Sequence, residues 1–193
     1  MKTDHGRAKA KVHRIVTDCA VDFLATYATH VKPHAGSATE LVKVASSTQS
    51  VGAVVTFSGT NIRGSLAVLS AFDFLAGCLQ RGDTPLRLPH ERVQDWSFVR
   101  DFAKETANQI LGRIKNRLAS CGVGLEARTP TALCGQVAKG MIMTRSRNPL
   151  VFAVGLQPVF VLWFDYSASN ETNQLILDGS AVPALCEGDV ALF

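Results

Sequence analysis

The segment that decides the fold is DWSFVRDFAKETANQILGRIKNRL, residues Asp95–Leu118. Apolar side chains recur in it at intervals of three and four residues, the period of an α-helix that buries one face. They are Val99, Ala103, Ala107, Ile110, Ile114 and Leu118. Asp95 or Ser97 can cap the amino end, and Gly122 ends the pattern. The segment therefore predicts one long, central amphipathic helix.

The outward face of this helix carries an unusual set of residues. With about 100° per residue and Val99 at zero, the apolar positions span roughly 20° to 100°. The opposite arc, at about 180° to 240°, holds Asn108, Asp101, Gly112 and Glu105. Asn108 and Gly112 both disfavour a helix interior, at a combined cost of about 1 to 1.5 kcal/mol relative to alanine. Residues that break a local rule without a packing gain indicate a candidate functional site, and a merely solvated face is the alternative.

The rest of the sequence predicts two further helices and several strands. A helix is expected over about Lys9–Thr29, ending before Pro33, and a shorter one over Ala71–Leu79. A hairpin is expected from Ala53–Phe57 and Ile62–Leu69, joined by Ser58-Gly59-Thr60-Asn61. Further strands are expected at Val123–Ala127, Gln136–Thr144, Leu150–Leu156 and Val159–Tyr166. This order predicts an α+β fold in which helices pack on an antiparallel or mixed sheet in two layers. The segments Val51–Leu69 and Met141–Tyr166 have similar patterns of apolar residues. An internal duplication is therefore an open alternative.

Composition indicates one globular domain over residues 1–193, with 47% hydrophobic and 19% charged residues. The net charge of +4 equals the excess within Met1–Ile15, so the basic residues form a short head and not a basic face. Nucleic-acid binding is therefore not expected. We expect residues 1–10 to be a flexible head, and residues 167–193 carry no assignment.

Several common chemistries lack their motifs. The five cysteines contain no Cys-x-x-Cys pair, and Pro33 separates His30 from His34, so a metal site is not expected. The segment Gly59–Ser65 has P-loop glycine spacing but no lysine. The longest apolar stretch, Val151–Phe164, is too short to span a bilayer. We expect a cytoplasmic protein without membrane association and without a metal or cofactor of its own.

The outward helix face resembles a known signature. Asp101-x-x-x-Glu105-x-x-Asn108, followed by Pro130, is similar to that of the CheC/CheX/FliY family of chemotaxis phosphatases: Asp or Ser, three residues, Glu, two residues, Asn, about twenty-two residues, Pro. Here 21 residues, 109–129, separate Asn108 from Pro130. Only one Glu-x-x-Asn helix is found, so the resemblance is to the single-site CheX type.

The resemblance implies an enzyme that removes the phosphoryl group from the aspartyl phosphate of a CheY-like response regulator. Asn108 would hold the attacking water and Glu105 would pair with a lysine of the regulator, while Asp101, Gly112 and Pro130 would contribute to docking. The regulator would supply Mg²⁺. A homodimer formed through sheet edges is also implied, with the strand at residues 159–164 as an available edge. The alternative within the same fold is a non-catalytic module that binds a response regulator or a flagellar-switch component.

Overall fold

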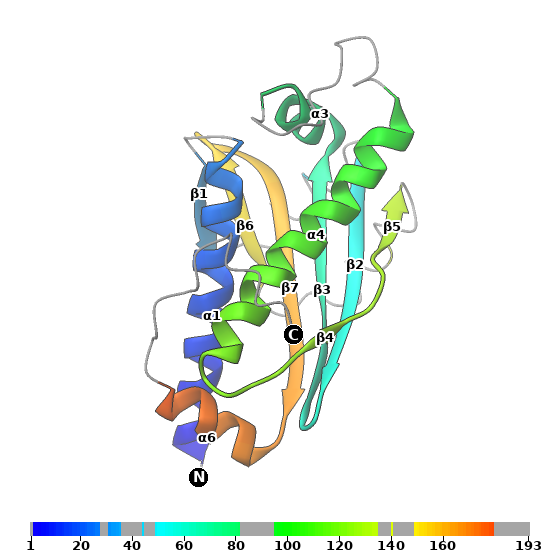
Figure 1. Cartoon of the computed structure of the whole chain (residues 1–193). Helices are drawn as coiled ribbons and strands as arrows, with labels where there is room; N and C mark the ends of the chain where they lie inside the picture. Colours follow the sequence, from blue (N-terminus) through cyan, green and yellow to red (C-terminus); the bar gives the residue numbers. More distant parts are fainter. Residues whose placement is uncertain are drawn as a thin grey trace.

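The computed structural model describes residues 2–27, 31–35, 44, 49–81, 95–134, 140 and 149–179. These residues form an α+β fold, as expected from the sequence (Figure 1). The elements are α1 (Lys2–Ala25), β1 (Val31–Ala35), β2 (Ser50–Gly59), β3 (Ile62–Ala71), α3 (Phe72–Arg81), α4 (Trp96–Ala119), β4 (Glu126–Ala127), β5 (Thr131–Cys134), β6 (Leu150–Val154), β7 (Gln157–Ala168) and α6 (Asn170–Asp178).

The strands form one seven-stranded sheet in the order β1-β6-β7-β3-β2-β4, with β5 also pairing with β2. Every pair is antiparallel. The predicted hairpin is confirmed: β2 and β3 pair from Ser50↔Ala71 to Gly59↔Ile62. Gly64 is required in this hairpin, since a Cβ there would collide with the carbonyl oxygen of Asp165 and the ring of Phe57.

The strand expected to be a free sheet edge is in the interior of the sheet. Residues 159–164 belong to β7, which pairs with β6 on one side and with β3 on the other. The expectation of an edge was wrong because the β6–β7 hairpin inserts between β1 and β3, a long-range arrangement that local pattern does not encode. Within the described residues, the edges of the sheet are β1 on one side and β4 with β5 on the other.

The chain contains a structural repeat. Among the described elements, the order helix, three strands, helix occurs first as α1-β1-β2-β3-α3 and again as α4-β5-β6-β7-α6, with β4 as an addition in the second half. The strand order β1-β6-β7-β3-β2-β5 is unchanged when each strand is exchanged for its counterpart and the order is reversed. The duplication left open by the sequence is therefore present in the topology, and α1 is the counterpart of α4.

Helices α1 and α4 lie side by side on one face of the sheet (Figure 1). All six apolar positions predicted to face the core from α4 are buried, from Val99 to Leu118. They pack with Leu66 of β3 and Phe160 of β7 in one large core cluster. A second cluster, which includes Leu69 and Trp163, lies on the other face of the sheet because side chains alternate along each strand. The core thus holds α4 against the sheet along most of its length.

Both ends of the described chain differ from the expectation. The basic head belongs to α1, which begins at Lys2, and Ala8 is fully buried. Lys11 Nζ donates a hydrogen bond of 2.6 Å to the carbonyl oxygen of Gly179, just after α6. Residues 2–10 are therefore the first turns of α1, and α6, a helix that the sequence did not predict, contacts them where Asn173 lies 3.3 Å from His5.

Other differences are local. His34 was expected in a loop but lies in strand β1, paired with Val151. Of the predicted strand 123–127, only the last two residues pair, as β4. His30 and, apart from Gly140, the predicted strand 136–144 lie outside the described residues. None of the described helices is both long enough and apolar enough to cross a bilayer.

Candidate functional site

Helix α4 is fixed at both ends and along its back. Asp95 is the N-cap: its Oδ1 accepts hydrogen bonds from the backbone N–H of Ser97 at 2.9 Å and from the Ser97 hydroxyl at 2.8 Å. The hydrogen bond from the Ser97 backbone N–H and, to a smaller extent, the one from its hydroxyl lower the pKa of the Asp95 carboxyl. Gly122, at φ +78°, lets the chain turn just beyond the helix. Since the inner face of α4 is buried, its outward face is a rigid platform.

The four helix residues singled out by the sequence do share this outward face. Asp101, Glu105 and Asn108 are exposed, and Gly112 is half-buried. Lys104 Nζ lies 2.6 Å from Asp101 Oδ1, and Gln109 Nε2 donates a hydrogen bond of 2.8 Å to Glu105 Oε1. The side chain of Asn108 makes no hydrogen bond with another described residue. A carboxylate and a carboxamide therefore stand one turn apart, directed away from the core.

Gly112 has no packing role among the described residues. A Cβ built at this position would meet nothing within 4 Å, and its backbone is not in the left-handed region. A glycine is costly in a helix interior, so neither packing nor backbone geometry accounts for it. It lowers the surface one turn beyond Asn108, where another chain could approach closely.

Pro130 is not part of this helix face. It is half-buried and lies directly before β5, a strand that contacts α4. The structure thus brings together four of the five predicted residues on α4 and leaves Pro130 on a neighbouring segment.

The counterpart helix α1 lacks the candidate site. The buried positions of the two helices match when Val12 is set against Val99, which also matches Ala20 with Ala107 and Phe23 with Ile110. In this alignment Asp18 stands for Glu105, Val21 for Asn108 and Ala25 for Gly112. Asp18 is a carboxylate like Glu105, but the aliphatic Val21 stands where α4 has the carboxamide of Asn108. Among the described residues, only α4 carries the pair.

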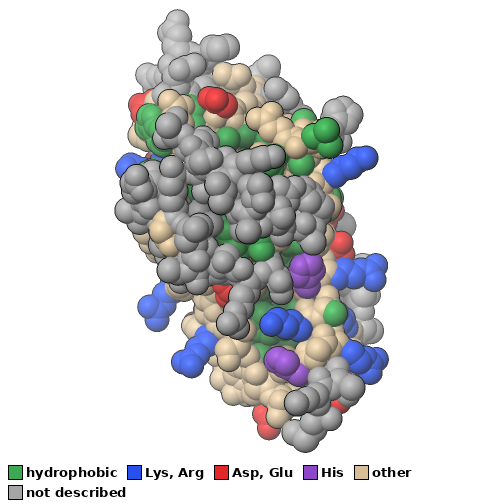
Figure 2. All heavy atoms as spheres, turned by 180° about the vertical axis from the view of Figure 1, so that it is seen from behind, with side chains coloured by type: hydrophobic (Ala, Val, Ile, Leu, Met, Phe, Trp, Pro, Cys, Tyr) green, Lys and Arg blue, Asp and Glu red, His purple; other side chains and the backbone are tan. Residues whose placement is uncertain are grey.

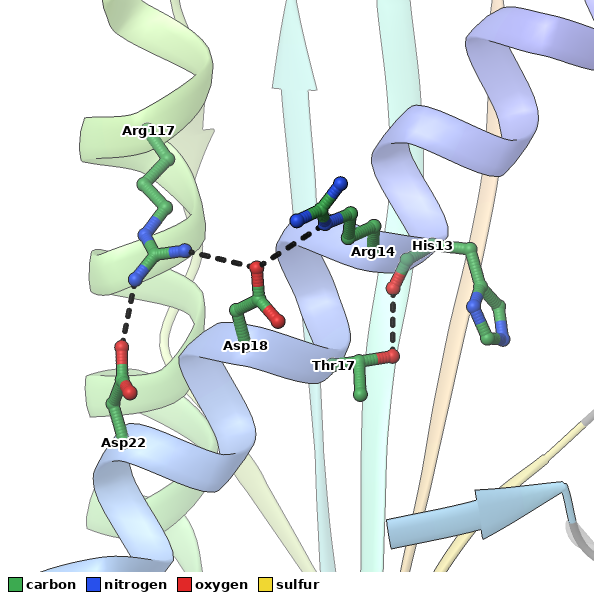
Figure 3. A network of polar contacts seen from close by, with 6 residues as sticks. All are labelled: His13, Arg14, Thr17, Asp18, Asp22 and Arg117. Atoms are coloured by element: carbon green, nitrogen blue, oxygen red, sulfur yellow. Dashed lines mark hydrogen bonds and ion pairs between the residues drawn. The ribbon is translucent and has the colours of Figure 1, made fainter. Parts of the chain in front are cut away.

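The acidic residues of α1 are instead used to hold α4 (Figure 3). Arg117 of α4 lies 3.5 Å from Asp18 Oδ2 through Nη1 and 2.7 Å from Asp22 Oδ2 through Nη2. Arg14 approaches Asp18 at 4.0 Å from the other side. Sequence reasoning missed this network. The i,i+4 spacing of the two aspartates was visible, but their partner is on a helix almost a hundred residues away.

The remaining metal-ligating and thiol side chains of the described residues form no second candidate site. Within the described part of the chain, no group of three or more His, Cys, Asp or Glu side chains is placed to hold a metal ion. Cys19, Cys78 and Cys121 are buried and Cys134 is exposed, and none of the four is in a disulfide. Burial raises the pKa of the Cys19 thiol to about 11, so it is unreactive near neutral pH. Cys186 lies outside the described residues.

Comparison with known proteins shows which solved structures share this fold. No family model matches the sequence, and no curated protein matches it. Among solved structures, chemotaxis protein CheX from Vibrio vulnificus aligns with a TM-score of 0.57 at 16% identity, over 79% of this chain and 97% of its own. A chain of the CheX–CheY–BeF3–Mg²⁺ complex from Borrelia burgdorferi gives 0.55 at 13% identity, over 79% and 96%. FliY from Thermotoga maritima gives 0.53 at 11% identity, over 88% and 93%. The chain therefore has the fold of the CheX, CheC-like and FliY chemotaxis proteins.

Proposed function

We propose that this protein is a phosphatase of the aspartyl phosphate of a CheY-like response regulator, with its active residues on the outward face of α4. The observation that carries the proposal is the presence of Glu105 and Asn108 one turn apart, both exposed on a helix whose opposite face is buried. A convex helix face has no room for a small substrate of its own. It suits a partner protein that brings the reacting group.

The reaction requires little covalent chemistry from this chain. Hydrolysis of an acyl phosphate needs a water held in line with the phosphorus and a stabilised transition-state charge. The Asn108 carboxamide, unbound by its neighbours, would enter the regulator's site and accept a hydrogen bond from the attacking water through Oδ1. A neutral amide orients water without competing with the regulator's carboxylates for Mg²⁺. That ion would be held by the regulator and would compensate the charge of the phosphoryl oxygens.

Glu105 would anchor the regulator. Its Oε1 is held by Gln109, and Oε2 remains for a lysine of the partner. The hydrogen bond from Gln109 restricts the carboxylate before docking, which reduces the entropy lost on binding. Asp101, with Lys104 against it, would contribute to docking one turn earlier, and Gly112 would admit close backbone approach one turn later. Pro130 would border the surface from the segment before β5.

The comparison structures support the class of partner. The Borrelia burgdorferi structure is a complex of CheX with CheY, BeF3 and Mg²⁺. The shared fold, together with a Glu-x-x-Asn helix that resembles the family signature, makes a CheY-like regulator the first partner to test. A homodimer, implied by the family resemblance, stays a prediction and would require β1, β4 or β5 as the edge.

The decisive experiment measures the lifetime of the phosphate on a phosphorylated response regulator from the same cell, with and without this protein. We expect the wild type to shorten it and Asn108→Ala to lose at least about 100-fold of that effect, the usual contribution of a positioned catalytic group. Asn116→Ala is the matched control, since Asn116 is an exposed asparagine two turns further along α4. Full activity in Asn108→Ala refutes the mechanism.

Glu105→Gln separates anchoring from chemistry. It keeps the shape and the hydrogen bond with Gln109 but removes the charge, so we expect weaker regulator binding with a smaller loss of the maximal rate. If the wild type binds the regulator without shortening the phosphate lifetime, the protein is a binding module. If it binds no phosphorylated regulator, the polar face of α4 is a solvated surface and the proposal fails.

A further inference from the structure

A cavity of about 190 Å³ lies between α1 and the sheet, away from the outward face of α4. Its apolar walls come from two sides: Val12 and Val16 of α1, and Leu150, Leu162 and Phe164 of β6 and β7. An apolar cavity of about 150 Å³ in a protein core is large enough for benzene. This cavity therefore has space for a compact apolar group slightly larger than a benzene ring.

The wall on the β7 side is aromatic. Phe164 and Tyr166 both line the cavity, and their ring centroids lie 5.8 Å apart. The hydroxyl oxygen of Tyr166 is itself buried, so the ring and not the hydroxyl forms this part of the wall.

The opening of the cavity is basic on the α1 side. Lys9 and His13 line it from successive turns of α1, and both are exposed. Neither side chain has an ion pair or a hydrogen bond with another described residue. Figure 3 shows the ring of His13 directed away from the Asp18–Arg117 ion pairs, so that network does not use it. Seen from behind, histidine and basic side chains border a hydrophobic stretch on the lower half of the molecule (Figure 2).

Asp165 is the one acidic residue among the described residues that line the cavity. It lies between Phe164 and Tyr166, which pack against the core on the side of the helices, so the alternation along β7 directs its side chain to the other face of the sheet. The charge at the opening therefore comes from α1, and the anionic end of a bound molecule belongs beside Lys9 and His13. The apolar body then lies against the valines, leucines and Phe164.

We propose that this cavity binds a small monocarboxylate with a compact apolar body. The proposal does not depend on the phosphatase activity, because the cavity and the outward face of α4 share no residue. The apolar volume selects the body, and the lysine and histidine at the opening select the negative charge. A neutral molecule of the same shape satisfies only the first of these conditions.

The test uses 3-phenylpropionate as the probe, titrated into the full chain and followed by NMR chemical shifts and calorimetry. A Kd of about 1 mM or tighter is expected for a ligand of this size. The alcohol 3-phenylpropan-1-ol is the neutral comparison, and we expect it to bind at least about 5-fold more weakly, the scale of a single charge-assisted contact. The absence of saturable binding of the carboxylate, or equal binding of the alcohol, overturns the proposal.

Exposed residues allow variants that leave the fold intact. Lys9→Gln and His13→Gln are each expected to weaken binding of the carboxylate by roughly 3- to 10-fold, as for a partly solvated charge contact. Lys115→Gln on α4 is the control and is expected to change nothing. Unchanged carboxylate affinity in both Lys9→Gln and His13→Gln refutes the site.

Discussion

Replacing Gly112 by alanine should make the protein more stable and less able to dock a regulator. Alanine is favoured over glycine in a helix interior by about 1 kcal/mol. The new Cβ would meet nothing within 4 Å, so no steric penalty offsets this gain. Gly112 is half-buried, and the backbone there is already helical. We therefore expect a gain of about 0.5 to 1 kcal/mol in the free energy of unfolding.

Urea unfolding followed by circular dichroism measures this change, and the melting temperature should rise by roughly 1 to 4 °C for a chain of this length. Gly64→Ala is the contrasting variant. Its Cβ would collide with the backbone of β7, so the same substitution should destabilise the protein severely. If Gly112→Ala is neutral or destabilising, the reasoning that this glycine has no structural role is refuted.

The functional half of the prediction is measured with the same variant. A methyl group on the outward face of α4 should weaken regulator binding several-fold while leaving Asn108 in place. A more stable variant with full affinity would remove Gly112 from the docking surface. A more stable variant with reduced affinity is expected, because functional positions often sacrifice stability.

Two further predictions concern stability. Arg117→Ala removes both ion pairs to α1, and because these side chains are 31–50% exposed we expect a loss of only about 0.5 to 1 kcal/mol, smaller in high salt, in urea unfolding. Burial raises the pKa of Cys19 from 9.0 to about 11, so the unfolded chain loses this proton before the folded one. Stability should therefore be unaffected by this thiol below pH 9 and fall between pH 9 and about 11 by up to roughly 1.4 kcal/mol per pH unit. Cys19→Ala should show a shallower decline, and an identical pH profile would contradict the assignment.

The elements that the sequence predicted are those whose signals are local. The helix α4 was readable because its apolar period continues over six turns and both ends have capping residues. The β2–β3 hairpin was readable because two apolar runs are joined by a short polar turn. By contrast, β1 has the sequence VKPHA, which is short and carries a proline at its centre, and both features hide the strand. Its pairing with β6 supplies what its own residues do not indicate.

Helix α6 was missed for a related reason. Its buried residues include Thr172 and Asn173, which read as surface residues in a one-dimensional pattern. The side chain of Asn173 lies 3.3 Å from His5 of α1, and such a contact is visible only in three dimensions. The order of the strands was unpredictable in the same way, since β3 and β7 are about a hundred residues apart in sequence.

For the candidate site, spacing alone was sufficient for the helix face. A regular helix converts positions 101, 105, 108 and 112 into one stripe without any tertiary information. What the sequence did not indicate was the cavity beside α1. Lys9, His13 and Tyr166 come from segments far apart in the chain, and only the packing of α1 on β7 brings them together.

The two halves of the structural repeat differ in the number of candidate sites that they carry. Two equivalent helices lie on the sheet, but one presents Glu105 and Asn108 while the other presents Asp18 bound to Arg117 and an aliphatic Val21. If α4 binds a regulator as proposed, a chain with this asymmetry has one such site among its described residues. A titration of regulator into protein should then reach its end point at an equimolar ratio, and any cooperativity between two bound regulators must come from association of two chains.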